Sequence, residues 1–410
     1  MRPIYNYGFF VLMFAVCFPN MGIAQEIPEH YHPARPNGIG GAFTAIANDE
    51  NAVWTNPAGI SRIRKPRTRR AVNLVRFPNV MVGANTKSRT FYNSLKGSAE
   101  ASDIGNVVSE TESLGDNPLW AMGSAFPMMM VDIGSFPSVI GGYLATTIKS
   151  VVDDSSKPDP LARTEAISDV GAVFSMAWTN RTNRINFGIQ ARSIKRYAFE
   201  DYVPVSLLAD NEGMKKKLQN ESNTSSALAL DAGFLWTFSD FWFPTLGIAV
   251  LNLPSGCKSD YLNPFSKKRE NVCGTKFSGN FSNPDAISVL DPTDIRFGLS
   301  ITPRFSRKFA ARIAFDIHHF FYQLGDQYLG FNGVDTLKLV HGGIEFFIGN
   351  PLLPAPFSVS VGINQGYYSM GGTFRWKFIT FEIASFGRDV SSTATPKEDR
   401  RTVGSLSFDF

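Results

Sequence analysis

Apolar and polar residues alternate along most of the chain. Between residues 228 and 238 every second residue is apolar, and polar or small residues such as Asp231 and Gly233 stand between them. The same period returns in Ile295, Phe297, Leu299 and Ile301, which alternate with Asp294, Arg296, Gly298 and Ser300. Because successive side chains of a strand point to opposite faces, this period predicts strands with one apolar and one polar face. The chain is therefore predicted to be all-β.

The alternating segments predict about fourteen strands, and an even strand number is typical of bacterial membrane barrels. We expect the strands at residues 70–84, 118–131, 136–149, 165–179, 183–199, 226–240, 243–255, 286–302, 306–321, 334–349, 355–365, 367–376, 377–387 and 401–410. Long connections at 85–117, 150–164, 200–225, 256–285, 322–333 and 388–400 alternate with short ones, and only the short connection at 366 departs from this rule. Long outer loops and short periplasmic turns alternate in this way in membrane barrels.

Two architectures fit the alternation, a secreted β-sandwich and a membrane barrel. The loop pattern favours the barrel, and so does the aromatic content, with 35 Phe residues. Trp120, Trp178, Trp236, Trp242 and Trp376 fall near predicted strand ends, which is typical of aromatic girdles at the membrane interfaces. No long apolar helix follows the first 24 residues, which excludes a helical membrane protein. We predict a transmembrane antiparallel β-barrel and keep the sandwich as the alternative.

Both ends of the chain indicate export to the bacterial outer membrane. Residues 8–18 form an apolar run that is too short to span a bilayer, and residues 22–24 are suited to signal-peptide cleavage before Gln25. At the other end Leu406, Phe408 and Phe410 alternate with polar residues. This ending resembles the last strand of outer-membrane barrels, whose final aromatic residue the barrel-assembly machinery recognises. Residues 1–24 are therefore predicted to be a signal peptide.

Charge and cysteine content narrow the functional classes. The formal net charge is +4, without a basic stripe, so a nucleic-acid partner is not expected. Two cysteines remain after signal-peptide removal, Cys257 and Cys273, and an even number in an exported chain predicts a disulfide. Neither Gly-x-Ser-x-Gly nor His-Glu-x-x-His occurs, and no spacing singles out a catalytic triad. We predict that the protein is not an enzyme and needs no metal or cofactor.

A glycine-rich stretch precedes the first predicted strand. Gly38, Gly40 and Gly41 have no strand before them and no Lys-Ser or Lys-Thr after them, so neither a dinucleotide site nor a P-loop is indicated. Glycine at these positions lets the backbone approach a wall closely and adopt positive φ. Asn56-Pro57 predicts a tight turn, in which Asn bonds its local backbone and Pro fixes φ.

The order of these elements resembles the N-terminal region of the FadL-like outer-membrane proteins, a family that includes long-chain fatty acid transporters and PorV-type barrels. The matching pieces are Ala34-Arg35, Gly38-x-Gly40-Gly41-Ala42, Ala47-Asn48-Asp49 and Asn56-Pro57-Ala58-Gly59. The resemblance implies a fourteen-stranded barrel, residues 70–410, whose lumen is closed by a hatch, residues 25–69. Whether the hatch gates the lumen or only packs inside it stays open.

The same resemblance implies a route for ligands, with capture by outer loops and exit through a kink in the third strand. Gly141-Gly142 in that strand is the candidate lateral opening, because glycine in a strand often marks a bend. Residues 204–218 predict an amphipathic helix in an outer loop. Its candidate ligand-capture residues are Leu207, Leu208, Lys215, Lys216 and Lys217, and a solvated charge run is the alternative for the three lysines.

The predicted lumen is not uniformly apolar. Its face carries Arg192, Asp231, Asp294, Arg296, Arg312, Asp316, Glu345 and Glu382, which could pair across the lumen and hold the hatch. We therefore keep two hypotheses. The first is uptake of hydrophobic small molecules, such as long-chain fatty acids, across the outer membrane. The second is a plugged barrel that anchors or shuttles a surface or secretion-system protein without transport.

Overall fold

The computed structural model describes residues 29, 31–63, 72–88, 118–154, 161–262, 269–279, 289–306, 309–320, 336–348, 355–390 and 397–410. The predicted signal peptide lies outside these residues, and so does most of the predicted connection 85–117. Among the described residues, no helix combines the length and the apolar character needed to cross a membrane.

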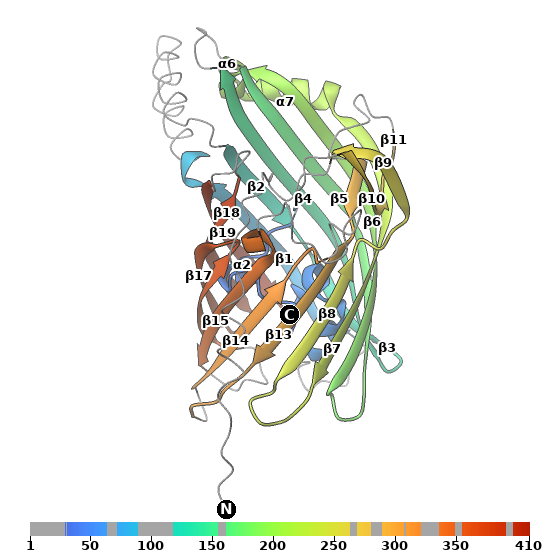
Figure 1. The fold of residues 1–410 in the computed structure, drawn as a ribbon, viewed down its shortest axis with the longest axis vertical. Helices are drawn as coiled ribbons and strands as arrows, with labels where there is room; N and C mark the ends of the chain where they lie inside the picture. The colour runs from blue at the N-terminus through green and yellow to red at the C-terminus, as the bar shows by residue number, and fades with distance from the viewer. Residues whose placement is uncertain are drawn as a thin grey trace, which may run out of the picture.

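The described strands close into an antiparallel barrel (Figure 1). The wall consists of β1 (Val72–Asn85), β2 (Leu119–Ala125), β3 (Met128–Ile133), β4 (Phe136–Asp154), β5 (Leu161–Thr179), β6 (Ile185–Pro204), β7 (Asn223–Thr237), β8 (Thr245–Leu251), β13 (Asp294–Ile301), β14 (Phe309–Ile317), β15 (Val340–Ile348), β16 (Phe357–Asn364), β17 (Tyr367–Trp376), β18 (Ile379–Asp389) and β19 (Glu398–Asp409). Because β2 and β3 both pair with β1 and β4, they share one wall position, and the described wall has 14 positions. Pairing of β1 with β19 closes the ring.

The fourteen predicted strands are confirmed, with differences at their ends. Strands β8 and β13 are shorter than predicted, because the chain beyond them enters a separate sheet at the outer end. That sheet contains β9 (Gly256–Leu262), β10 (Arg269–Lys276) and β12 (Leu290–Pro292). Cys257 and Cys273 are joined there by a disulfide across the β9–β10 pair, in the predicted long connection.

Apolar side chains cover the outside of the barrel and charged side chains line its inside. Leu228 is 58% exposed and Leu230 45%, whereas Asp231, beside them in the chain, is 2% exposed. This distribution is the reverse of a soluble sandwich, in which the apolar face is buried against a second sheet. The apolar exterior therefore matches a wall that faces lipid, and the sandwich alternative is excluded.

One tryptophan departs from the predicted girdles. Trp178, Trp236, Trp242 and Trp376 are all exposed, as side chains at a membrane interface must be. Trp120 is instead 1% exposed, because it points into the lumen, where the Arg401 guanidinium lies 4.5 Å from its ring centroid. The prediction for Trp120 was wrong, because a position near a strand end does not determine which face the residue occupies.

The N-terminal segment, residues 31–63, lies inside the ring of strands, where Figure 1 shows it in blue. It contains α2 (Ala34–Gly38), α3 (Ala52–Thr55) and the 3-10 helix η1 (Pro57–Arg62). Its apolar side chains, among them Phe43, Ile46 and Val53, form a buried cluster with wall residues such as Phe126 and Tyr143. The core of this barrel is therefore the contact between the N-terminal segment and the wall.

Two helices cover the outer end of the barrel, α6 (Val205–Ala209) and α7 (Asn211–Glu221), at the top of Figure 1. The sequence predicted one helix over 204–218. The structure breaks it at Asp210, whose side chain accepts a hydrogen bond from the Glu212 amide and so caps α7. The short strand β11 (Ser278–Gly279) pairs with β7 nearby, and the 3-10 helix η4 (Thr336–Leu339) precedes β15.

The lipid-facing assignment predicts a depth-dependent cost for an introduced charge. Val361, in the middle of β16, is 53% exposed on the outer face. We expect Val361→Arg to lower the free energy of unfolding by about 2–4 kcal/mol in lipid vesicles, measured by urea titration. Phe357→Arg, at the end of the same strand, should cost less, because arginine there reaches the headgroups. Equal costs at the two sites would contradict the assignment.

Candidate functional site in the barrel lumen

A belt of wall glycines holds the N-terminal segment at backbone distance. Within the described residues it comprises Gly188, Gly233, Gly247, Gly298, Gly343, Gly362 and Gly371, which lie on seven different strands. A methyl group added at any of them would overlap the N-terminal segment. At Gly371 it would lie 2.8 Å from the Cα atom of Gly38. The glycine belt therefore lets two backbones pack without an intervening side chain.

The residues of the sequence motif form the other side of this contact. Gly40 and Gly41 have φ values of +72° and +83°, which side chains rarely tolerate. His341 Nδ1 lies 3.0 Å from the Gly40 carbonyl oxygen. Asn56 accepts a hydrogen bond from the Ala58 amide and donates to the Thr44 carbonyl at 2.9 Å, so its side chain fastens two turns of the segment. Pro57 begins η1 directly after it.

Buried ion pairs add a polar anchor. Arg35 donates two hydrogen bonds to Glu345 on β15, both of 2.8 Å, and it also pairs with Asp49 of its own segment. Arg312 on β14 donates to the same Glu345 carboxylate at 2.6 Å. A bidentate Arg–carboxylate pair fixes orientation as well as distance. The segment is therefore attached by its charges to β14 and β15, and a further buried ion pair, between Glu50 and Arg76, attaches it to β1 beside the wall interruption described below.

The remaining predicted lumen charges are also buried and have partners. Asp231 accepts from Arg192 at 2.9 Å, and Asp294 pairs with Arg296. Asp316 accepts a hydrogen bond of 2.6 Å from the Thr44 amide. Glu382 pairs with Arg375 at 3.4 Å. These ion pairs join residues of one strand or of neighbouring strands and do not cross the lumen, and among these contacts the one made by Asp316 reaches the N-terminal segment.

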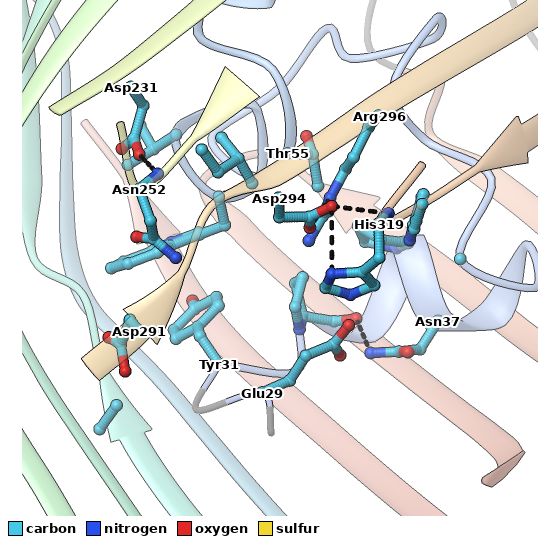
Figure 2. Close-up of a pocket in the computed structure, with 18 of the residues that line it drawn as sticks. Glu29, Tyr31, Asn37, Thr55, Asp231, Asn252, Asp291, Asp294, Arg296 and His319 are labelled. Atoms are coloured by element: carbon cyan, nitrogen blue, oxygen red, sulfur yellow. Dashed lines mark hydrogen bonds and ion pairs between the residues drawn. The ribbon is translucent and has the colours of Figure 1, made fainter. Parts of the chain in front are cut away.

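A cavity of about 150 Å³ lies between the N-terminal segment and the outer end of the wall. Figure 2 shows Glu29 and Tyr31 on one side of it and Asp294, Arg296 and His319 on the other. Its lining combines aromatic rings with charged groups. A second cavity, of about 480 Å³, is lined by Arg35, Glu345 and residues at the end of the short turns. The N-terminal segment therefore separates two cavities in the lumen.

Two neighbouring histidines, beyond the end of β14, face the first cavity. Burial lowers the pKa of His318 well below its ordinary value, and the nearby His341 adds to the shift. Burial also lowers the pKa of His319, although the Asp294 carboxylate opposes it. Both imidazoles are therefore neutral at pH 7, which leaves each ring one donor and one acceptor nitrogen.

The wall is interrupted next to the predicted lateral opening. The second wall position breaks between β2 and β3 at Phe126-Pro127, and the register of β1 shifts between Arg76 and Asn79, around Pro78. Proline has no amide hydrogen, so Pro78 and Pro127 each remove a donor from neighbouring strands. Among the described residues, one hydrogen bond bridges the gap on each side, from the Phe126 amide to the Asn79 carbonyl and from the Gly142 amide to the Pro127 carbonyl. The register with β4 is the same before and after the gap.

An aromatic cluster closes this interruption from inside. Phe126 is fully buried and meets Trp54 of the N-terminal segment edge to face, with ring centroids 5.3 Å apart. Trp54 also contacts Tyr143 at 5.3 Å and stacks on Tyr31 at 4.2 Å. Trp54, Tyr31 and Tyr143 line the first cavity. The cluster therefore stands between that cavity and the gap in the wall.

The structure brings some of the predicted site residues together. A methyl group at Gly141 would lie 2.8 Å from the Phe126 ring, so Gly141 abuts the interruption. A methyl group at Gly142 would meet only the Gly171 carbonyl at 3.8 Å, because Gly142 faces outward. The sequence analysis missed Phe126 and Trp54. Proline inside two adjacent predicted strands was the signal that could have located the gap.

The predicted ligand-capture residues lie elsewhere. Leu207 and Leu208 pack against Phe199 and Val203 on the outer face of the wall, together with Met214 and Leu218. No residue of α6 or α7 is among the described residues that line the first cavity. Lys217 is bound to Asp201 at 2.7 Å and Glu221 at 2.8 Å, and these hydrogen bonds raise its pKa. Lys217 therefore already has two acidic partners, and the ligand-capture role of the three lysines stays a prediction.

No family model and no curated protein sequence matches the chain. Solved structures do match it. A mutant form of the monoaromatic hydrocarbon channel TodX has a TM-score of 0.52 at 10% identity, over 92% of this chain and 98% of that chain. The Pseudomonas putida toluene transporter TodX has a TM-score of 0.50 at 9% identity, over 94% of this chain and 99% of that chain.

These comparisons show the class of fold, a closed antiparallel β-barrel like those of these channels. The fold implied by the resemblance to FadL-like proteins is thereby confirmed. A barrel with a lipid-facing apolar exterior indicates an outer-membrane protein.

The glycine belt predicts a strong difference between two adjacent residues. Gly371→Ala places a methyl group 2.8 Å from the Gly38 Cα atom, whereas Gly372→Ala meets only ordinary contacts, the nearest at 3.7 Å. We expect Gly371→Ala to cost about 1–3 kcal/mol of stability and to speed hydrogen exchange in residues 34–46. Exchange should be unchanged in Gly372→Ala. Equal exchange in both variants would show that the segment does not depend on this contact.

The ion-pair anchor predicts a similar contrast. Glu345→Gln leaves Arg35 and Arg312 close together with one carboxylate removed, so we expect a loss of about 3–5 kcal/mol in unfolding free energy. Ser358, which donates to the same carboxylate at 3.1 Å, gives the matched control. Ser358→Ala should cost about 1 kcal/mol. A Glu345→Gln barrel as stable as the control variant would contradict the anchoring role.

Proposed function

We propose that this barrel takes up hydrophobic molecules of one-ring size across the outer membrane and releases them sideways through its wall. The observation that carries the proposal is the interruption at Phe126-Pro127, where single backbone hydrogen bonds and aromatic side chains replace a regular ladder. An apolar ring can replace another apolar ring without exposing backbone donors. A ladder of hydrogen bonds offers no such exchange.

The proposed route of the ligand runs past the aromatic residues that contact Trp54. A ligand enters the first cavity from the outer end and lies against Tyr31, Trp54 and Tyr143. Displacement of the Trp54 side chain then opens the way past Phe126 to the gap. Trp54 is suited to this movement, since its ring is only partly buried. The N-terminal segment acts as a hatch that closes the axis of the barrel while the ligand passes beside it.

The volume of the first cavity limits the size of the molecule that the barrel could transport. A cavity of about 150 Å³ is the size that holds benzene in other proteins, and a long acyl chain would need more room. Two of the similar structures are those of a monoaromatic hydrocarbon channel and a toluene transporter. We therefore favour a one-ring compound over the long-chain fatty acids that the family resemblance implied.

Assembly and location follow from the same fold. The exported chain folds into the outer membrane after removal of residues 1–24, and the barrel-assembly machinery recognises the last strand with Phe408 and Phe410. Phe410 is 72% exposed, and its backbone pairs with Val75 to complete the ring. Transport needs no catalytic group, cofactor or metal, and we propose that the protein is not an enzyme.

A second candidate function is supported by the attachment of the N-terminal segment. Seven backbone contacts and the Arg35 ion pairs suit a permanent plug, and a plugged barrel could anchor a surface or secretion-system protein through its outer sheet and helices. We rank it second, because a purely structural plug gives no reason for the gap at Phe126-Pro127.

Three substitutions near the gap test the transport proposal. We expect Gly141→Val to press on Phe126 and lower the uptake rate of radiolabelled toluene by about tenfold, in cells that lack other channels for it. Gly142→Val faces lipid and should leave the rate unchanged. Trp54→Ala removes the ring that closes the gap and should raise the rate.

Surface expression is the control. The hairpin that contains the Cys257–Cys273 disulfide must be detected at the cell surface in equal amounts for every variant. Equal uptake by cells with and without the wild-type barrel would overturn the transport proposal. If uptake depends on the barrel but Gly141→Val and Gly142→Val behave alike, the lateral route is wrong and an axial route replaces it.

A further inference from the structure

A groove lies beneath α7 on the outside of the barrel, apart from the lumen. Its volume is about 650 Å³, and it is lined by Ile148, Tyr197, Leu208, Met214, Lys215, Leu218, Gln219, Ser222 and Thr224. Ile148 shares the outer face of β4 with the exposed Leu144, and Thr224 shares the outer face of β7 with the exposed Leu228. Because those exposed side chains face lipid, the groove opens toward the membrane and not toward the lumen.

Strand register places the groove at the boundary between lipid and water. Leu144, Val170 and Lys195 lie in one row across β4, β5 and β6, and Tyr197 lies one residue pair farther out. The Lys195 ammonium is 5.3 Å from the centroid of the Tyr197 ring. A lysine on a lipid-facing surface extends its ammonium toward the headgroups, where tyrosine is also enriched. The row of Tyr197 therefore marks the headgroup level of the outer leaflet.

The rim of the groove is basic. Among the residues that the structure describes, Lys195 and Lys215 form no ion pair with an acidic side chain, and both are exposed. Two of the acidic side chains near α7, Asp201 and Glu221, are bound by Lys217, which offsets part of their charge. The other two, Asp210 and Glu212, lie at the first turn of α7. The floor of the groove is apolar, through Ile148, Leu208 and Met214.

We propose that this groove binds one lipid of the outer leaflet that carries a phosphorylated headgroup. Its phosphate lies between Lys195 and Lys215, and its acyl chain follows Leu144, Val170 and Leu228 down the wall. An apolar floor, a basic rim and a position at headgroup level together fit an anionic lipid. A free phosphate would use only the rim, and a neutral lipid only the floor. The bound lipid stabilises the α6–α7 pair on the barrel.

The first test measures lipid retention. The full-length barrel is purified, stripped of lipid in detergent and titrated with bisphosphorylated lipid A, while native mass spectrometry counts the lipids bound per barrel. We expect one retained lipid, and about tenfold or weaker affinity in the Lys195→Gln and Lys215→Gln double variant. Lys216→Gln is the matched control, because Lys216 is exposed on the same helix but does not line the groove. It should bind lipid A as the wild type does.

Two further measurements separate the contributions of charge and of apolar surface to lipid binding. Dephosphorylated lipid A should bind the wild type about tenfold more weakly than the phosphorylated form. Gln219→Trp, which fills the groove without changing charge, should also abolish retention. Folding of each variant is checked by its heat-modifiable migration on a gel. The proposal would be overturned if the double variant retained lipid A as well as the wild type, or if the wild type bound the dephosphorylated lipid as tightly as the phosphorylated one. Displacement of the lipid by millimolar inorganic phosphate would overturn it as well.

Discussion

The direct contact between two backbones, the N-terminal segment and the glycine belt of the wall, is the constraint on which the rest of this structure depends. Seven strands each carry a glycine where they meet the segment. The missing side chains cost the wall packing but bring the segment within reach of polar anchors such as Glu345 and Asp316. The lumen is thereby divided into two cavities. A segment held this way closes the axis of the barrel, so a route past it must run along its edge.

The edge of the N-terminal segment lies beside the part of the wall where the hydrogen-bonded ladder is interrupted. Two prolines on neighbouring strands remove ladder hydrogen bonds, and the gap is filled by rings of Phe126 and Trp54. The polar lumen and the apolar gap have separate roles in this account. Charges hold the segment in place, whereas aromatic side chains, which exchange contacts at little cost, provide the movable part.

The sequence predicted the barrel well, because lipid selects the outer face of every strand. The run Leu228 to Phe238 shows the alternation that results, and the predicted strand order and loop plan followed from it. The sequence pattern gave less information about the side of the strands that faces the lumen. Glycines such as Gly233 and Gly371 contact a segment far away in the chain, and no local pattern shows what they touch. Trp120 was misplaced for a related reason, since its partner Arg401 lies at the other end of the sequence.

The central claim is that cargo passes sideways while the N-terminal segment stays attached to the wall. Ser61 donates a hydrogen bond of 2.8 Å to Asn186, so cysteines at these two positions can link segment and wall covalently. The measurement is uptake of a labelled one-ring hydrocarbon by the Ser61→Cys and Asn186→Cys barrel, before and after reduction, beside the wild type under the same treatment. The account predicts equal uptake in the linked and reduced states. Loss of uptake in the linked state and its return on reduction would show that the segment must move out, and would contradict the account.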